Sequence, residues 1–325
     1  SGMLMNSIRF KIIGLSSLSI FAVSLIMIVL ILSKNTDTQK EVTQQASAML
    51  EKVVLDQILA LGKYQASELG SRLLAAEKIA NSLSSSTLSY KKSHANSFDS
   101  REKVLLSLQD QLLTHNELLG TYVAFEKDAF DGRDDEFIDD LTTASDKTGR
   151  FVPYVYQTNQ QLGQEALVSY EDQTRDSNGV RAGEYYLCPK ETKRSCLTDP
   201  YLYPVGGEQV LLSSFVSPIL NNGQFLGIAG VDMSLKFIQQ VVDENNNNIY
   251  GGIGKMAVIS QSGIVAGYSN NSAMLGKTLS LESDSHWKKL SKEQSPQAKI
   301  EISNGQLYAI IPVTTETRAT GWAVL

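Results

Sequence analysis

The sequence predicts an α+β protein in which one long N-terminal helix carries two tandem modules, each built on an antiparallel sheet. Three observations support this fold class. An uncharged apolar run near the N-terminus continues into a long helical pattern that no proline interrupts. Near Gly120 the spacing of apolar residues changes from helical to alternating, and turn residues separate the apolar runs from there on. After residue 245 an order of strands and a helix recurs in a shorter form.

The apolar run covers residues 12–32, which read IIGLSSLSIFAVSLIMIVLIL and include no charged side chain. A helix of this length spans about 30 Å, the thickness of the hydrocarbon core of a bilayer. Arg9 and Lys11 precede it, so residues 1–11 are expected to be a cytoplasmic leader and the rest of the chain to lie outside the cytoplasm. The two residues ahead of the first methionine resemble a cloning remnant. The alternative is a cleaved signal peptide, whose apolar core is usually shorter and ends at a small-residue site.

Residues 35–90 predict a continuous stalk helix. Apolar side chains recur at threes, fours and their sums, and polar side chains fill the other face. The apolar stripe needs a partner, and two remain open: a second copy of the chain, which would make a homodimer, or the chain's own domain. The stripe consists of Leu50, Val54, Ile58, Leu61, Leu69, Leu73, Ala76, Ala80 and Leu83.

The first module is assigned to residues 91–244. A helix is expected after Asp99, because Glu102 and a new helical periodicity follow it. Two later apolar runs flank Asn221-Asn222-Gly223, which is a hairpin signal. The proline inside residues 149–157 predicts a strand that is bent or lies at an edge. The predicted strands are 121–127, 149–157, 183–189, 210–220 and 224–235, with a short helix at 236–244.

The second module is assigned to residues 245–325 and begins with a loop of asparagines and glycines at 245–254. Its predicted elements are two strands within 255–269, a helix at 283–293, a hairpin over 299–313 around Asn304-Gly305, and a strand at 320–325. The sequence stops inside this apolar strand, so we expect the chain to continue and to cross the membrane a second time after Leu325.

Composition narrows the function classes. Hydrophobic residues make up 42% of the 325 positions and charged residues 20%, as in an ordinary folded chain, and the net charge of −6 with no basic patch argues against nucleic acid as a partner. The three histidines are scattered, and no GxSxG, HExxH or Walker motif occurs, so we expect no enzyme, no cofactor and no catalytic residues. The acidic residues 128–136 miss the spacing of a calcium loop, so we expect a solvated loop and no metal site.

Cys188 and Cys196 are the two cysteines. Outside the cytoplasm a close pair of cysteines is more often a disulfide than a metal site, and the spacing is not CxxC. We therefore expect a disulfide between them. The alternative is two unpaired thiols on a loop.

Tyrosines are concentrated in the first module, and alternation along residues 149–157 places Tyr154 and Tyr156 on one face of a strand. Tyrosine packs a ring and offers a hydroxyl group, which suits a small amphiphilic ligand, although tyrosine is also a common strand former. Asp232 stands on a glycine-rich strand, and a carboxylate with aromatic walls favours a cationic group. The candidate ligand-binding residues are Tyr154, Tyr156, Tyr201 and Asp232, followed by Tyr122, Arg150 and Tyr203.

The segments GRFVPYVYQ, DPYLYPVGGEQVLLSSFVSPI and FLGIAGVDMSL, behind a membrane anchor and a long helix, resemble the double Cache sensor domain of bacterial methyl-accepting chemotaxis receptors. The resemblance runs from about residue 35 to residue 325. It implies two PAS-like modules in the periplasm, anchored in the inner membrane, with the ligand in the membrane-distal first module.

Amino-acid binders of this family carry an Arg-x-Trp-Tyr signature and an aspartate, and the chain matches the signature only in part. Tyr156 and Asp232 match, whereas Pro153 and Val155 stand in place of the arginine and the tryptophan, and Arg150 lies three residues too early. The resemblance therefore implies an amine, an amino acid or a similar small organic ligand.

From these observations we expect the sensor region of a transmembrane chemoreceptor, in which ligand binding displaces a helix across the membrane. Two alternatives remain. The output could be a histidine kinase or a cyclase, or the module could recognise a partner protein and no small ligand.

Overall fold

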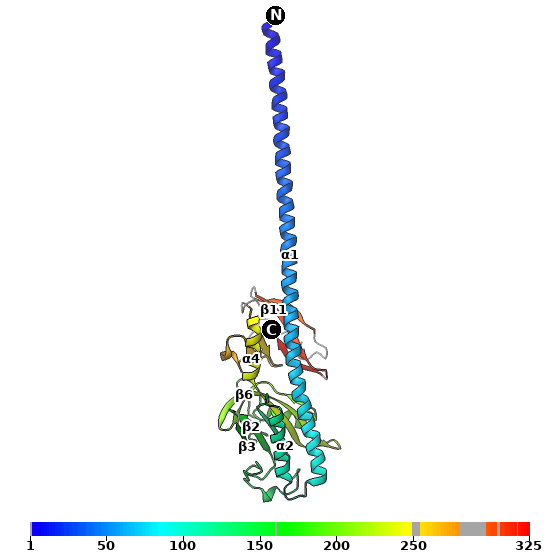
Figure 1. The fold of residues 1–325 in the computed structure, drawn as a ribbon, viewed down its shortest axis with the longest axis vertical. Helices are drawn as coiled ribbons and strands as arrows, with labels where there is room; N and C mark the ends of the chain where they lie inside the picture. Colours follow the sequence, from blue (N-terminus) through cyan, green and yellow to red (C-terminus); the bar gives the residue numbers. More distant parts are fainter. Residues whose placement is uncertain (1, 160, 249–253, 280–296, 304–305, 317) are drawn as a thin grey trace. The chain divides into compact units, whose positions relative to one another are not determined.

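The computed structural model describes residues 2–159, 161–248, 254–279, 297–303, 306–316 and 318–325 (Figure 1). Contacts divide the chain into two compact units, Ser1–Ile58 and Leu59–Leu325. The first unit is helical, and the second holds the rest of the long helix together with two antiparallel sheets. The predicted α+β fold class is confirmed.

Helix α1 (Gly2–His94) contains the predicted span and the predicted stalk in one uninterrupted helix. Within its described part, one stretch near the N-terminus is long and apolar enough to cross a membrane, and none of that stretch is buried inside the protein. The side chains of Val29, Leu30 and Ile31 are each about 60% exposed. A continuous exposed apolar surface of this kind needs lipid or another protein to cover it.

The apolar stripe of α1 divides between its two possible partners. In the second unit, Leu69, Leu73 and Leu83 are buried against the chain's own domain. In the first unit, Leu50 is exposed. The chain's own core therefore accounts for the C-terminal part of the stripe, and pairing with a second copy remains a prediction for the N-terminal part.

The first sheet holds seven strands in the order β3-β2-β1-β7-β6-β4, and β5 pairs with β6. The predicted hairpin is confirmed, because Asn222 and Gly223 both take positive φ, as a two-residue hairpin turn requires. The strands are β1 (Gly120–Phe125), β2 (Pro153–Thr158), β3 (Gln161–Ala166), β4 (Cys196–Leu197), β5 (Tyr201–Val205), β6 (Glu208–Asn221) and β7 (Gln224–Ser234).

The strand with the internal proline was expected to be bent or to lie at an edge. Strand β2 begins at Pro153 and lies between β1 and β3, so the edge alternative is wrong. Proline is tolerated here because it is the first residue of the strand, where its missing N–H costs no interior ladder bond.

Helix α2 (Ser100–Thr114) confirms the helix predicted after Asp99. It packs on one face of the first sheet, where the hydroxyl group of Thr121 donates to the carbonyl group of Leu108 at 2.9 Å. Since side chains alternate along a strand, Tyr122 points to the opposite face.

The strand predicted at 183–189 is wrong: these residues belong to helix α3 (Glu184–Thr192). Tyrosine is a good strand former, and a short apolar run does not distinguish a strand from a helix by its period. Packing decides the outcome, because Tyr185, Tyr186 and Leu187 are all buried in the helical conformation. The predicted disulfide between Cys188 and Cys196 is present and ties α3 to β4.

The acidic loop is not simply solvated, contrary to expectation. Asp131 and Asp134 each accept from the buried guanidinium group of Arg101 at 2.8 Å, and this pairing fixes the loop that contains the short 3₁₀ helix Asp134–Glu136. Among the described residues no group of three acidic, histidine or cysteine side chains is placed to hold a metal ion.

The second sheet has the order β10-β11-β12-β8-β9. Its strands are β8 (Ala257–Ile259), β9 (Val265–Tyr268), β10 (Lys299–Ser303), β11 (Gln306–Thr314) and β12 (Ala319–Val324), and they confirm the strands predicted within 255–269, 299–313 and 320–325; the 3₁₀ helix Ser272–Met274 follows β9. The helix predicted at 283–293 and the turn at Asn304-Gly305 lie outside the described residues.

Helix α4 (Leu235–Asn248) confirms the predicted short helix but extends further, so the expectation that residues 245–248 form a loop is wrong. Its buried side chains Leu235, Ile238 and Val242 recur at helical spacing. This packing carries the helix into the asparagine run, although asparagine favours helices only weakly.

Candidate functional site

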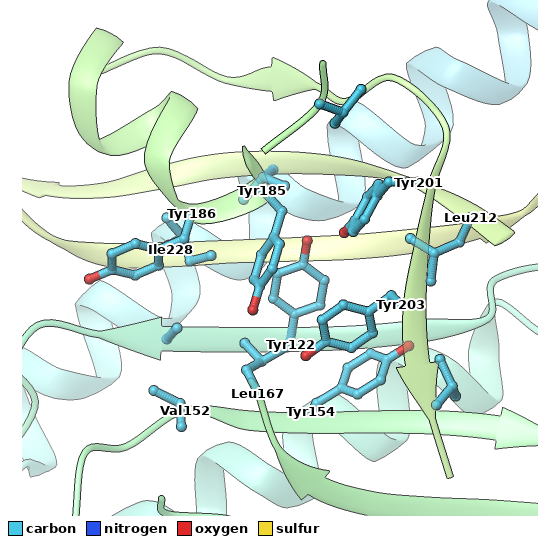
Figure 2. Close-up of a cluster of buried hydrophobic side chains, with 14 of the residues drawn as sticks. Tyr122, Val152, Tyr154, Leu167, Tyr185, Tyr186, Tyr201, Tyr203, Leu212 and Ile228 are labelled. Atoms are coloured by element: carbon cyan, nitrogen blue, oxygen red, sulfur yellow. The ribbon is translucent and has the colours of Figure 1, made fainter. Parts of the chain in front are cut away.

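Five tyrosine side chains gather on the face of the first sheet opposite α2 (Figure 2). Strand pairing explains part of this cluster, because Tyr122 of β1 stands beside Tyr154 of β2 on one side and Gly230 of β7 on the other. Strand β5 and helix α3 add the remaining rings. We call these five residues the tyrosine cage: Tyr122, Tyr154, Tyr185, Tyr201 and Tyr203.

The rings of the cage fill the space between them. Neighbouring ring centroids lie 5.6 to 6.3 Å apart, mostly in edge-to-face contact, which is the favoured geometry of aromatic pairs. All five side chains are at most 5% exposed. The cage is therefore a closed core in this structure, and a ligand can enter only if rings move apart.

Two glycines make the cage possible. A Cβ atom at Gly230 would overlap the ring of Tyr122, and a Cβ atom at Gly120 would overlap the ring of Tyr154. These rings lie flat over the neighbouring strands because no side chain occupies those positions. The glycines in the segments GTYVAF and GIAGVD are thus part of the site's construction.

Asp232 lies at one end of the cage on β7 and is 2% exposed. The hydroxyl group of Ser214 donates to its carboxyl group at 2.6 Å, and the hydroxyl groups of Tyr201 and Ser214 lie 2.8 Å apart. Burial raises the pKa of Asp232 to about 7, although the bond from Ser214 lowers it in part. A buried carboxyl group with a pKa near neutrality is a recognised marker of a functional site.

The hydroxyl groups of Tyr122 and Tyr154 are buried and have no hydrogen-bond partner of ordinary geometry. Both hydroxyl groups face Asp232 closely enough to lower its pKa. Leaving a buried polar group without a partner costs about 1–3 kcal/mol, so such groups require an explanation.

The structure brings together five of the seven residues predicted from the sequence: Tyr122, Tyr154, Tyr201, Tyr203 and Asp232. Tyr156 lies at the margin of the cage, with its ring centroid 5.7 Å from that of Tyr154.

Arg150 lies apart from Asp232 and belongs to a different cluster. Its guanidinium group donates to the carbonyl oxygen of Phe125, to Glu171 and to the hydroxyl group of Tyr186. It also stacks over Tyr170. Each of its three nitrogen atoms has a partner there, and Arg150 is not among the groups that set the pKa of Asp232.

Sequence reasoning missed two residues of the site. Tyr185 was assigned to a strand, and its place in the cage depends on α3. Ser214 carries no local signal, but it pairs with Asp232 across the hairpin of β6 and β7. The predicted hairpin register could have identified it, because residues opposite each other in a hairpin share a face.

Comparisons with known proteins define the class of this chain. Residues 105–240 match the family model described as "Methyl-accepting chemotaxis protein-like, first PDC sensor domain". The resemblance drawn from the sequence is confirmed, because this part of the chain is similar to the first sensor domain of methyl-accepting chemotaxis proteins.

Among curated proteins, the chain is 28% identical over 327 residues to the methyl-accepting chemotaxis protein TlpQ of Pseudomonas aeruginosa. The match covers 98% of this chain and 46% of TlpQ, so the chain spans about half the length of the curated relative that it matches.

Two solved structures illustrate the similarity of fold. An extracellular domain assigned to a histidine kinase, mmHK1S-Z3, is 29% identical with a TM-score of 0.68, over 84% of this chain and 93% of that one. The periplasmic sensory domain of the Campylobacter jejuni chemoreceptor Tlp1 has a TM-score of 0.61 over 83% of this chain and 92% of that one. At 13% identity, the second similarity concerns the fold alone.

Proposed function

We propose that this chain is the periplasmic sensor region of a transmembrane chemoreceptor, anchored in a bacterial inner membrane, whose first module binds a small organic ligand with an ammonium group at the tyrosine cage. The observation that carries the proposal is the burial of Asp232. Its carboxyl group is enclosed by the protein, and no cation is among the groups that set its pKa. The role is binding and signalling, without catalysis or a cofactor.

The atoms around Asp232 fit a primary ammonium group. Such a group has three N–H donors and no acceptor. The carboxyl group of Asp232 and the unpaired hydroxyl groups of Tyr122 and Tyr154 offer three acceptors. The aromatic faces around them attract a cation, by about 2 kcal/mol where water is excluded.

The closed cage favours one alternative, in which the tyrosines are only a structural core and the module recognises a partner protein. Asp232 argues against it. A purely structural core has no use for a buried carboxyl group without a cation, because the cost of burying that group is not offset. A ligand that supplies three donors would offset it.

Strand β6 connects this site to helix α1. Ser214 on β6 binds Asp232, and four residues later the carbonyl group of Pro218 accepts from Ser84 of α1 at 2.8 Å. Ser217 also bonds to Asn81 of α1. We therefore propose that ligand entry, which must displace rings and β6, shifts α1 and transmits a helix displacement across the membrane.

The test is calorimetric titration of the full chain in detergent micelles with a panel of primary amines and α-amino acids. We expect at least one amine to bind, and Asp232→Asn to weaken it about tenfold to a hundredfold, since a hydrogen bond to a charged group contributes about 1.5–3 kcal/mol. Asp110→Asn, which removes a carboxylate from the exposed face of α2, is the matched control and should leave binding unchanged. A panel without a binder, or a ligand that binds Asp232→Asn as well as the parent chain, would refute the proposed site.

The type of output has two candidates. The match to TlpQ favours a chemotaxis output, and the similarity to a domain assigned to a histidine kinase favours a kinase. We propose the chemotaxis output, because the family model that matches 105–240 is of the methyl-accepting chemotaxis type. Swarm-plate assays with the full-length gene and a deletion strain would distinguish the two.

A further inference from the structure

A second cavity, separate from the cage, lies where helix α1 meets strand β6, the turn between α3 and β4, and the residue before β12. Its volume is about 480 Å³, which is in the range of small-molecule sites. Its walls carry one acid, Glu77, and three cations, Lys193, Arg194 and Arg318. The whole chain has a net charge of −6, so this local excess of positive charge runs against its general character. Such a cavity attracts anions, because low-dielectric walls focus the field of the cations.

Arg318 carries a charge that the protein compensates only in part. Its guanidinium group donates to the carbonyl group of Ser195 at 2.8 Å, and its Nε atom is buried without a hydrogen-bond partner. Burial lowers the pKa of Arg318, and the charge of Glu77 raises it by less than burial lowers it. A second negative charge beside Arg318 would therefore stabilise its ionised form.

Asn81 of α1 holds an amide group in a fixed orientation at the wall of the cavity. The hydroxyl groups of Ser195 and Ser217 both donate to its Oδ1 atom. The Nδ2 atom, which has two N–H donors, makes no hydrogen bond with a described residue. These two donors are thus free for an acceptor in the cavity.

Two further donor groups on the wall make no hydrogen bond within the part of the chain that the structure describes. The guanidinium group of Arg194 is exposed and offers its donors in a planar fork, which matches the geometry of a carboxylate or a phosphate. Ser85 lies one turn after Asn81 on the same side of α1 and adds a hydroxyl group. Free donors from two separate segments therefore border the cavity that the charge of Arg318 also lines.

We propose that this cavity binds a small oxyanion, either inorganic phosphate or the carboxylate group of an organic acid. Its oxygen atoms accept from the amide group of Asn81 and from the guanidinium group of Arg194, and its charge offsets that of Arg318. The bound anion connects α1 with the turn between α3 and β4 and with the start of β12. It therefore stabilises the arrangement of the long helix and both sheets within the Leu59–Leu325 unit.

The test is calorimetric titration of the full chain in detergent micelles with sodium phosphate and, separately, with sodium succinate, at an ionic strength held constant with sodium chloride. We expect one or both anions to bind. Arg194→Gln should weaken this binding about tenfold, because it removes charged hydrogen bonds. Lys147→Gln, which removes an exposed cation elsewhere in the first module, is the matched control and should leave it unchanged.

Asn81→Asp tests the same site with almost no change of shape. The carboxylate keeps an oxygen that accepts from Ser195 and Ser217, but it replaces the two free donors with a second charged oxygen, so it should abolish oxyanion binding. Asn116→Asp adds the same charge at an exposed position between α2 and β1 and should preserve the binding. Asn81 is itself exposed, so its replacement should not prevent folding.

The outcomes decide the inference without reference to the cage. Binding of phosphate alone or of succinate alone, with these variant effects, would support the site and identify its anion. If neither anion binds more tightly than chloride, or if Arg194→Gln or Asn81→Asp binds it as tightly as the parent chain, the proposed site is wrong. The titrations contain no amine and Arg194 is not part of the cage, so failure here leaves the proposed function untouched.

Discussion

Asp232 shows how a single buried group can set the behaviour of the site. Water solvates a carboxylate far better than a ring of phenols does, so burial favours the protonated form and raises the pKa of Asp232 to about 7. The groups that face it are Ser214 on β6 and tyrosines on β1, β2 and β5, and the pKa values of these tyrosines are raised, so they stay neutral. A proton and an organic cation therefore compete for Asp232.

Binding should consequently depend on pH. A cation requires ionised Asp232, so the affinity for an amine should fall about tenfold for each pH unit below 7 and become constant above pH 8. Titrations with butylamine between pH 5 and pH 9 measure this. A flat profile over that range would show that Asp232 is not the counter-ion.

The same group should make the folded chain less stable at high pH. Asp232 has a raised pKa in the folded state, so its contribution to stability is largest below the unfolded value near 4 and is lost as the pH rises toward 7. Asp232→Asn should therefore raise the melting temperature at pH 8 relative to the parent chain, and this gain should shrink toward pH 4. Paired thermal melts at the two pH values provide the measurement. A variant that is less stable at pH 8 would contradict the assignment of an unfavourable buried charge.

At the residue scale the sequence predicted many residues of the candidate site, but it did not predict that the tyrosine rings would fill the space between them. Five of its seven candidate residues meet around the cage because alternation and the hairpin register are local features. The sequence could not place Arg150, since its partners Glu171 and Tyr186 come from loop and helix segments distant in sequence. Strand β3 was not predicted, because it contains polar and glycine residues and gives no strand signal.

Helix α3 is the element that closes the cage, and its anchorage depends on the disulfide. It carries Tyr185, whose hydroxyl group donates to the carbonyl group of Val168 at 2.6 Å, and the bond between Cys188 and Cys196 attaches its C-terminal half to β4. The sequence predicted the disulfide from cysteine spacing but missed the helix. Cysteine chemistry is local, whereas the choice between strand and helix was decided by packing.

Removal of the disulfide should therefore affect both stability and binding. In the chain-entropy model a loop of this length contributes about 2.5 kcal/mol, so the double variant Cys188→Ser/Cys196→Ser should be destabilised by roughly that amount. The affinity for the amine should also fall several-fold, because a looser α3 no longer holds Tyr185 in place. Urea unfolding and calorimetry of the oxidised, reduced and double-variant chains supply the measurement. If amine affinity does not change while stability falls, α3 is not part of the binding site.

On the scale of the whole sensor domain, the two sheets of the Leu59–Leu325 unit are joined by specific polar contacts. Asp199 accepts from the hydroxyl group of Ser262 at 2.7 Å, and Asn178 donates to the carbonyl group of Gly276 at 2.9 Å. Arg318, just before β12, donates to the carbonyl group of Ser195 at 2.8 Å and stacks over Phe215 of β6. These contacts connect residues far apart in sequence, so sequence patterns could predict two modules but not how they meet.

Arg318 is placed to couple the modules, because Phe215 directly follows Ser214, which binds Asp232. Displacement of β6 by a ligand must change this contact, so amine binding should alter hydrogen exchange in β8, β9 and β12 of the second sheet.

Arg318→Leu should leave amine affinity within about twofold, since Arg318 does not contact the cage, but should abolish the change in the second sheet. Arg194→Leu, which removes an exposed cation beside Ser195, is the matched control and should preserve that change. Hydrogen-exchange mass spectrometry with and without amine distinguishes the variants. Retention of the full response in Arg318→Leu would mean that the signal reaches the second sheet through α1 or through Asp199 instead.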